Sequence, residues 1–191
     1  MASFTFVLEP FEVRVGSRTY HRFGLRGEVG PFGRAEVEYP VARDDDTNLF
    51  AAEVRGEHLP TARLTGRAYS YMPSLGGARV DIEGRQVILR RRWWALTRGG
   101  RALRLDHEGA RYTYIAVGSG RDFELRRADT RVLLRRRGWA WGRVPVEGQA
   151  SGPVNAVDMA LAVLLEGVDT RNLTLSRALR WGPYRLMYAL V

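Results

Sequence analysis

One segment of the chain limits the possible folds more than any other. Residues 153–167 read PVNAVDMALAVLLEG, and only Asn155, Asp158 and Glu166 interrupt its apolar residues. A helix that is apolar on every face must be buried on every face. The rest of the fold must therefore surround this segment.

The ends and the length of this segment favour a helix. Ser151 or Gly152 can cap its start, Pro153 suits its first turn and Gly167 suits its end. At about 1.5 Å per residue the helix would be about 20 Å long, too short for a bilayer but close to the height of a small β-barrel. Elsewhere, no stretch of the sequence reaches the run of about 20 apolar residues that a transmembrane helix needs.

The first 145 residues have the pattern of short antiparallel strands. Positions 34–41 and 61–72 alternate apolar and polar residues, which predicts half-buried strands. From residue 78 onward, glycine turn signals recur at short intervals, as in a meander. We predict loops at 25–33 and 73–77. Strands are predicted near 78–82, 85–96, 101–106, 110–117, 121–127 and 130–141.

A meander followed by one apolar helix indicates a sheet wrapped around that helix. We therefore predict a mainly β fold, an antiparallel β-barrel around a buried helix at about 153–167. A β-sandwich with a packed helix is the alternative. Residues 1–191 are treated as a single domain, with 168–191 as a C-terminal extension that either packs on the body or docks a membrane or a second protomer.

The meander from about 85 to 145, with RRRWWAL at its start, and the closing NAVDMALAVLLEGVD resemble the tubby C-terminal-like group. This group includes tubby, the phospholipid scramblases and the plant LURP-one-related proteins. The resemblance implies a barrel of about twelve strands around a hydrophobic C-terminal helix. It assigns no site residue, because no basic residue here aligns with the phosphoinositide contacts of tubby.

The net positive charge of the chain favours anionic partners. The formal net charge is +9 and the pI is about 10.7, which attracts nucleic acid, anionic lipid or acidic proteins. All 30 basic residues are arginine, as expected of a GC-rich coding sequence, so arginine runs are less informative here than usual. We see no secretory signal and expect a cytoplasmic protein. Any contact that it makes with a membrane is expected to be peripheral.

Residues that could support catalysis are poorly arranged. The three histidines do not form a metal-binding pair, and there is no cysteine. Asp106, His107 and Glu108 resemble a triad, but a strand would turn His107 to the opposite face, so we interpret them as a hairpin tip. The run Asp44–Asp46 lacks the spacing of a calcium loop. We expect no enzyme, no catalytic residue, no cofactor and no metal site.

The segments VILRRRWWAL, residues 87–96, and VLLRRRGWAW, residues 132–141, repeat one pattern 45 positions apart. As strands, both copies place alternate residues on opposite faces. In the first copy Arg90, Arg92 and Trp94 share the face opposite Val87, Leu89 and Arg91. In the second copy Arg135, Arg137 and Trp139 share the face opposite Val132, Leu134 and Arg136. Arginine binds phosphate in a bidentate manner and stacks on indole rings, and tryptophan favours membrane interfaces. The candidate anion-binding residues are Arg90, Arg92, Trp94, Arg135, Arg137 and Trp139.

Three predicted strands separate the two copies, which places them about 19 Å apart at roughly 4.8 Å per strand. Two separate basic patches fit a broad anionic surface better than one pocket. Our leading hypothesis is a module without enzymatic activity that binds anionic phospholipid surfaces peripherally. The alternative functions are a protein-interaction or assembly subunit that docks through its tryptophan-rich face and C-terminal tail, and nucleic-acid binding. The repeat itself can also be purely structural, the same strand built twice.

Overall fold

The computed structural model describes residues 3–15, 20–40, 43–44, 49–69, 71–92, 95, 97–118, 121–138 and 143–174. Two α-helices, α1 (Arg98–Arg101) and α2 (Ala156–Glu166), and two 3₁₀ turns, η1 (Gly30–Phe32) and η2 (Arg171–Leu173), accompany the strands. The strands are β1 (Ser3–Val15), β2 (Tyr20–Glu28), β3 (Arg34–Tyr39), β4 (Arg43–Asp44), β5 (Leu49–Gly56), β6 (Ala62–Tyr69), β7 (Met72–Pro73), β8 (Arg79–Ile82), β9 (Arg85–Arg90), β10 (Leu103–His107), β11 (Ala110–Val117), β12 (Asp122–Arg127), β13 (Thr130–Arg136) and β14 (Val146–Ser151).

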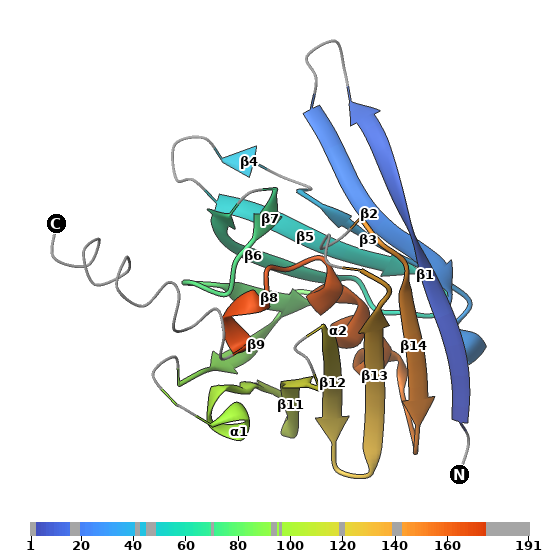
Figure 1. The fold of residues 1–191 in the computed structure, drawn as a ribbon, viewed down its shortest axis with the longest axis vertical. Helices are drawn as coiled ribbons and strands as arrows, with labels where there is room; N and C mark the ends of the chain where they lie inside the picture. The colour runs from blue at the N-terminus through green and yellow to red at the C-terminus, as the bar shows by residue number, and fades with distance from the viewer. Residues whose placement is uncertain are drawn as a thin grey trace, which may run out of the picture.

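Twelve of these strands form a closed antiparallel barrel (Figure 1). Their order around the barrel is β5-β3-β2-β1-β14-β13-β12-β11-β10-β9-β8-β6, and the pairing of β5 with β6 closes it. The two-residue strands β4 and β7 attach outside this ring. The structure thus confirms the predicted antiparallel barrel with a C-terminal helix.

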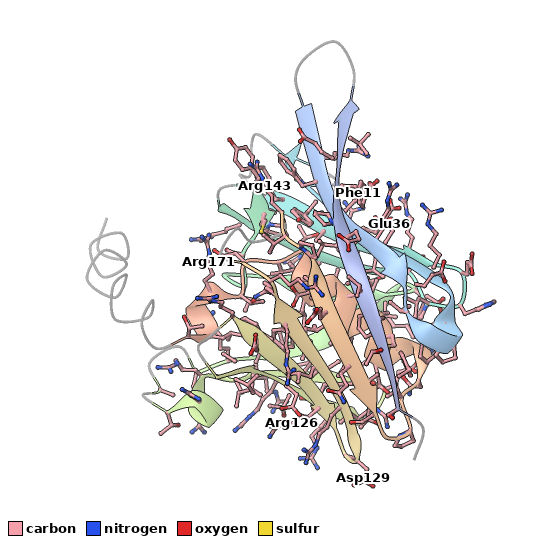
Figure 2. All side chains as sticks on the ribbon, turned by 45° about the vertical axis from the view of Figure 1, so that its right-hand side comes forward. Phe11, Glu36, Arg126, Asp129, Arg143 and Arg171 are labelled. Carbon is pink, nitrogen blue, oxygen red and sulfur yellow. The ribbon has the colours of Figure 1, made fainter. Side chains whose placement is uncertain are left out.

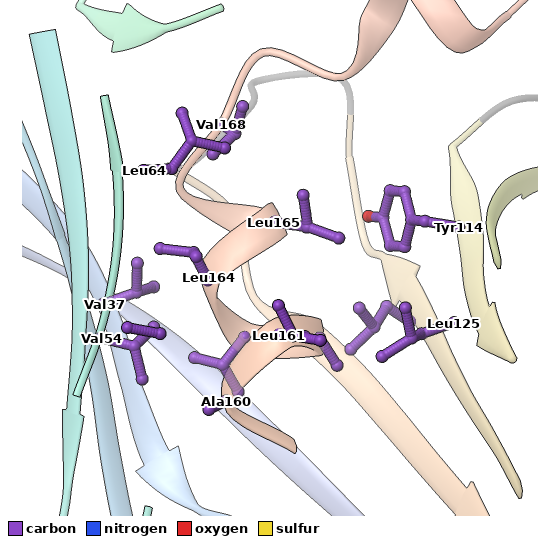
Figure 3. Packing of buried hydrophobic residues seen from close by; sticks show 14 of the residues in the cluster. Val37, Val54, Leu64, Tyr114, Leu125, Ala160, Leu161, Leu164, Leu165 and Val168 are labelled. Carbon is purple, nitrogen blue, oxygen red and sulfur yellow. The ribbon is translucent and has the colours of Figure 1, made fainter. Parts of the chain in front are cut away.

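Helix α2 lies inside the barrel. Every residue from Met159 to Leu165 is fully buried. In Figure 3 the helix packs between Val37 and Val54 on one side and Tyr114 and Leu125 on the other. An all-apolar helix is stable in this position because strands surround it.

The helix is shorter than the predicted 153–167, because its start differs from the expected one. Asn155 is the N-cap: its side chain accepts a hydrogen bond from the Asp158 N–H, and the Asp158 carboxylate accepts one from the Asn155 N–H. This capping box satisfies two free backbone donors of the first turn. Pro153 stays outside the helix, and its carbonyl instead accepts hydrogen bonds from Arg127 and Thr130.

Several predicted boundaries were wrong. β9 ends at Arg90 and β13 at Arg136, short of the predicted 96 and 141. The predicted loop 25–33 is strand β2 up to Glu28. Its glycines misled the prediction: a Cβ at Gly27 would lie 2.0 Å from the Val7 carbonyl oxygen, so glycine here permits close contact within the sheet.

The two ends of the barrel differ in the length of their connections. At the end where α2 begins, here called the turn end, three hairpins are closed by two residues each, at 83–84, 108–109 and 128–129. Glu108 and Gly109 both have positive φ, as a type I′ hairpin turn requires. At the end where α2 finishes, here called the loop end, the connections 91–102 and 137–145 are much longer.

Candidate functional site

The structure orients the described arginines of the repeat as predicted. In β9, Val87 is buried, whereas Arg90 and the following Arg92 are exposed. The predicted residues of the second copy, Arg135 and Arg137, are exposed as well. The other two candidates, Trp94 and Trp139, lie outside the described residues.

The two copies are separated as expected. β10, β11 and β12 lie between β9 and β13, which corresponds to about 19 Å at roughly 4.8 Å per strand. Because β9 and β13 run in the same direction, both end at the loop end of the barrel. The two arginine clusters therefore belong to one end of the molecule without forming one pocket.

The four predicted arginines differ in their ion pairs. Arg90 lies 3.7 Å from Asp106, and the Arg137 Nε donates to Glu147 at 2.7 Å. Exposed pairs of this kind contribute only about 0–1 kcal/mol, so either guanidinium can exchange its partner for a ligand. Arg92 and Arg135 make no ion pair with the described part of the chain.

Arg135 nevertheless has acidic neighbours. Asp122 and Glu147 stand directly opposite it on β12 and β14. Arg135 and Glu147 also line a shallow depression of about 400 Å³ together with Val7 and Leu133. The carboxylates lower the positive potential at this point, which makes Arg135 a weaker anion contact than Arg92.

The middle arginine of the second copy has a structural role. Arg136 points into the barrel, where its Nε donates to the Glu166 carboxylate of α2 at 2.7 Å. Its guanidinium lies 4.7 Å from the centre of the Phe123 ring. The Tyr114 hydroxyl donates to Glu166 at 3.2 Å, and burial raises the pKa of Tyr114 well above its usual value. This network anchors the C-terminal turn of the helix.

A matching pair anchors the first turn of the helix. Arg127 of β12 donates from Nε and Nη2 to the two carboxylate oxygens of Asp158, at 2.6 and 2.8 Å. In the sequence, Asp158 and Glu166 are only interruptions of an apolar segment. The apolar pattern does not predict that two arginines on neighbouring strands neutralise these carboxylates. Neither the helix sequence nor the strand sequences specify which strand residues contact the helix.

The net charge is concentrated in one part of the sequence. Residues 85–138 contain 15 arginines and 5 acidic residues, a net charge of +10. Since the whole chain has +9, the remaining residues together carry −1. The basic character therefore resides in strands β9 to β13 and their connections.

The connections at the two ends of the barrel also carry opposite net charge. The connections at the turn end contain four acidic residues, Glu57, Glu83, Glu108 and Asp129, and no arginine. The described residues of the connections at the loop end, with β4 left aside and 167–174 after the helix included, contain eight arginines and one acidic residue, a net +7. In Figure 2, Arg143 lies toward the loop end and Asp129 at the opposite tip.

An aromatic cluster accompanies this basic end. Tyr71 is 59% exposed, and its ring meets the Phe23 ring edge-on, with the centroids 5.7 Å apart. The Arg143 guanidinium lies 4.3 Å from the Phe23 centroid and 5.7 Å from that of Tyr71. Cation–π attraction of this kind holds an exposed tyrosine and an arginine side by side. Sequence analysis did not predict this cluster, because its residues come from three distant segments.

Comparison with protein-family models, with curated proteins and with solved structures finds no match to this chain. The resemblance to the tubby C-terminal-like group stays a prediction. Within the described ranges, no three His, Asp or Glu side chains are grouped so that they could bind a metal ion. None of the helices in this part of the chain is long and apolar enough to cross a membrane.

Proposed function

We propose that this protein is a module without enzymatic activity that binds anionic phospholipid surfaces peripherally through the loop end of its barrel. The observation that supports the proposal best is the opposite net charge of the connections at the two barrel ends, +7 against −4 in their described residues. A membrane with a negative surface potential attracts the connections of the loop end and repels those of the turn end, which favours approach by the loop end.

The side chains at the loop end suit a lipid interface. Arg92 and Arg98 are exposed, and neither forms an ion pair with the described part of the chain. Each basic residue near an anionic membrane contributes about 1 kcal/mol. Tyr71 places an amphipathic ring beside Arg143, and tyrosine is enriched where apolar and aqueous regions meet. The tubby-like resemblance implies the same class of ligand.

Co-sedimentation with neutral and anionic liposomes at about 0.1 M salt tests the proposal, because surface charge is only partly screened under these conditions. We expect the wild-type protein to pellet selectively with anionic vesicles. The variant Arg92→Gln/Arg98→Gln removes two charges at the loop end and should weaken binding by roughly 30-fold, about 1 kcal/mol for each arginine.

A matched control removes two charges elsewhere. Arg34 and Arg55 are exposed near the turn end, and each faces a glutamate on a neighbouring strand, Glu28 and Glu36 respectively. Arg34→Gln/Arg55→Gln has the same net charge as the loop-end variant and should bind nearly as well as the wild type. Equal losses in both variants would show that total charge, and not the loop end, governs binding.

A further inference from the structure

The register of the sheet forms a line of hydrogen-bond donors that no single segment of the sequence contains. On the outer face, directly opposite residues connect seven neighbouring strands from β9 to β1. Every member of this line is an arginine, a threonine or a serine. In order the residues are Arg90, Arg104, Thr113, Arg126, Arg131, Ser151 and Ser3. We call this set the donor row.

The donor row is long and accessible. Its six strand spacings of about 4.8 Å give a length of roughly 29 Å. All four arginines are exposed, as is Ser3, and the other two hydroxyl residues are half-buried. The neighbouring rows on the same face are mixed: one contains Ile115, Glu124 and Leu133, and the other Ile88 and Asp106.

The row contains two unfavourable contacts. Arg90 stands directly opposite Arg104, and Arg126 directly opposite Arg131. Like charges in such positions destabilise a sheet. Glu124 partly compensates the second pair, at 2.6 Å from Arg126 and 3.9 Å from Arg131, but its side chain is almost buried, whereas the side chains of Arg126 and Arg131 are 47% and 67% exposed. Arg104 has no ion pair with the described residues.

Because the row curves around the barrel, only a ligand that can follow this curve can contact the whole row. Barrel strands tilt by about 35–45° to the barrel axis, so a row perpendicular to the strands winds around the barrel. A flat membrane touches a cylinder along a line parallel to its axis and would reach only part of the row. Duplex DNA is stiff over about 150 base pairs and cannot follow the curve either. A flexible chain of phosphates can.

We infer that the donor row binds the phosphate backbone of a single-stranded nucleic acid, a partner distinct from the lipid surface of the proposed function. Arginine and hydroxyl donors contact phosphate oxygens without reading bases. The described part of this face contributes no aromatic side chain to the row, so binding should be independent of base sequence and strongly dependent on salt.

Fluorescence anisotropy with a labelled oligothymidylate of 15 nucleotides tests the inference. Arg104→Gln/Arg131→Gln should weaken binding roughly tenfold and lower the slope of log K against log salt by about 1.4, since each single-strand phosphate contact contributes about 0.7. Arg34→Gln/Arg55→Gln, with the same net charge, should bind like the wild type. A duplex of the same length should bind more weakly than the single strand.

The outcomes also separate this inference from the proposed function. Row variants should lose oligonucleotide binding and keep liposome binding, whereas Arg92→Gln/Arg98→Gln should do the reverse. Equal binding of duplex and single strand, equal losses in the control variant, or binding of inorganic polyphosphate without binding of the oligonucleotide would each overturn the inference.

Discussion

The ion pair between Arg136 and Glu166 allows a demanding test of how the helix is held in the barrel. The two side chains are 2% and 0% exposed, and their charges lie between β13 and the last turn of α2. Breaking a buried pair by removing one partner costs about 3–5 kcal/mol, because the other charge stays buried without compensation. At about 3 °C per kcal/mol for a domain of this size, Arg136→Met should lower the melting temperature by roughly 9–15 °C.

Two further variants make the test specific. Arg136→Met/Glu166→Leu replaces the pair with apolar side chains and should recover at least half of the lost stability, since apolar substitutes for buried ion pairs are often neutral. The neighbouring Arg137→Met breaks an exposed pair with Glu147 and should cost less than about 1 kcal/mol. Thermal and urea unfolding followed by circular dichroism measures all three. If the double variant were no more stable than Arg136→Met, the uncompensated charge of Glu166 would not be the cause of the loss.

Two other predictions concern stability. Asn155→Ala removes one half of the capping box and should cost about 1 kcal/mol in urea unfolding, while Asn155→Asp should keep most of it. Burial raises the pKa of Tyr39 and Tyr114 above the usual 10.0. Their contribution to the free energy of unfolding is therefore complete below pH 10 and is lost as the pH rises toward their pKa values in the folded state. Tyr114→Phe should therefore flatten the decline of the unfolding free energy above pH 10 by up to about 1.4 kcal/mol per pH unit; an unchanged slope would contradict this assignment.

The architecture was predictable because its two signals are local. Alternation with a period of two specifies a half-buried strand, and an apolar segment such as 153–167 permits only a buried helix. Together they predicted the barrel around the helix. The error at 25–33 arose because glycine has two uses: it is common in loops, but Gly27 in β2 allows close contact with β1.

The candidate site was less predictable, because anion binding depends on which residues stand opposite one another. The sequence placed Arg90 and Arg135 on the outer face, and both are there. It did not show that Asp122 and Glu147 flank Arg135, or that Arg104 stands opposite Arg90. A shift of one residue in the pairing of two strands would change every such neighbour, and nothing in the repeated phrase specifies that pairing.

The run of three arginines at 135–137 shows why the phrase is not a motif. Arg135 faces outward among carboxylates, Arg136 neutralises Glu166 inside the barrel, and Arg137 pairs with Glu147 at the surface. Three identical side chains thus have three different environments within seven ångströms of strand. The donor row is the converse, since its arginines come singly from four strands and become neighbours only when the sheet forms. A phosphate-binding line of this kind depends on residues that the strand pairing places opposite one another, and not on residues adjacent in sequence. The variants of Arg104 and Arg131 test two such positions and leave residues 87–96 and 132–141 unchanged.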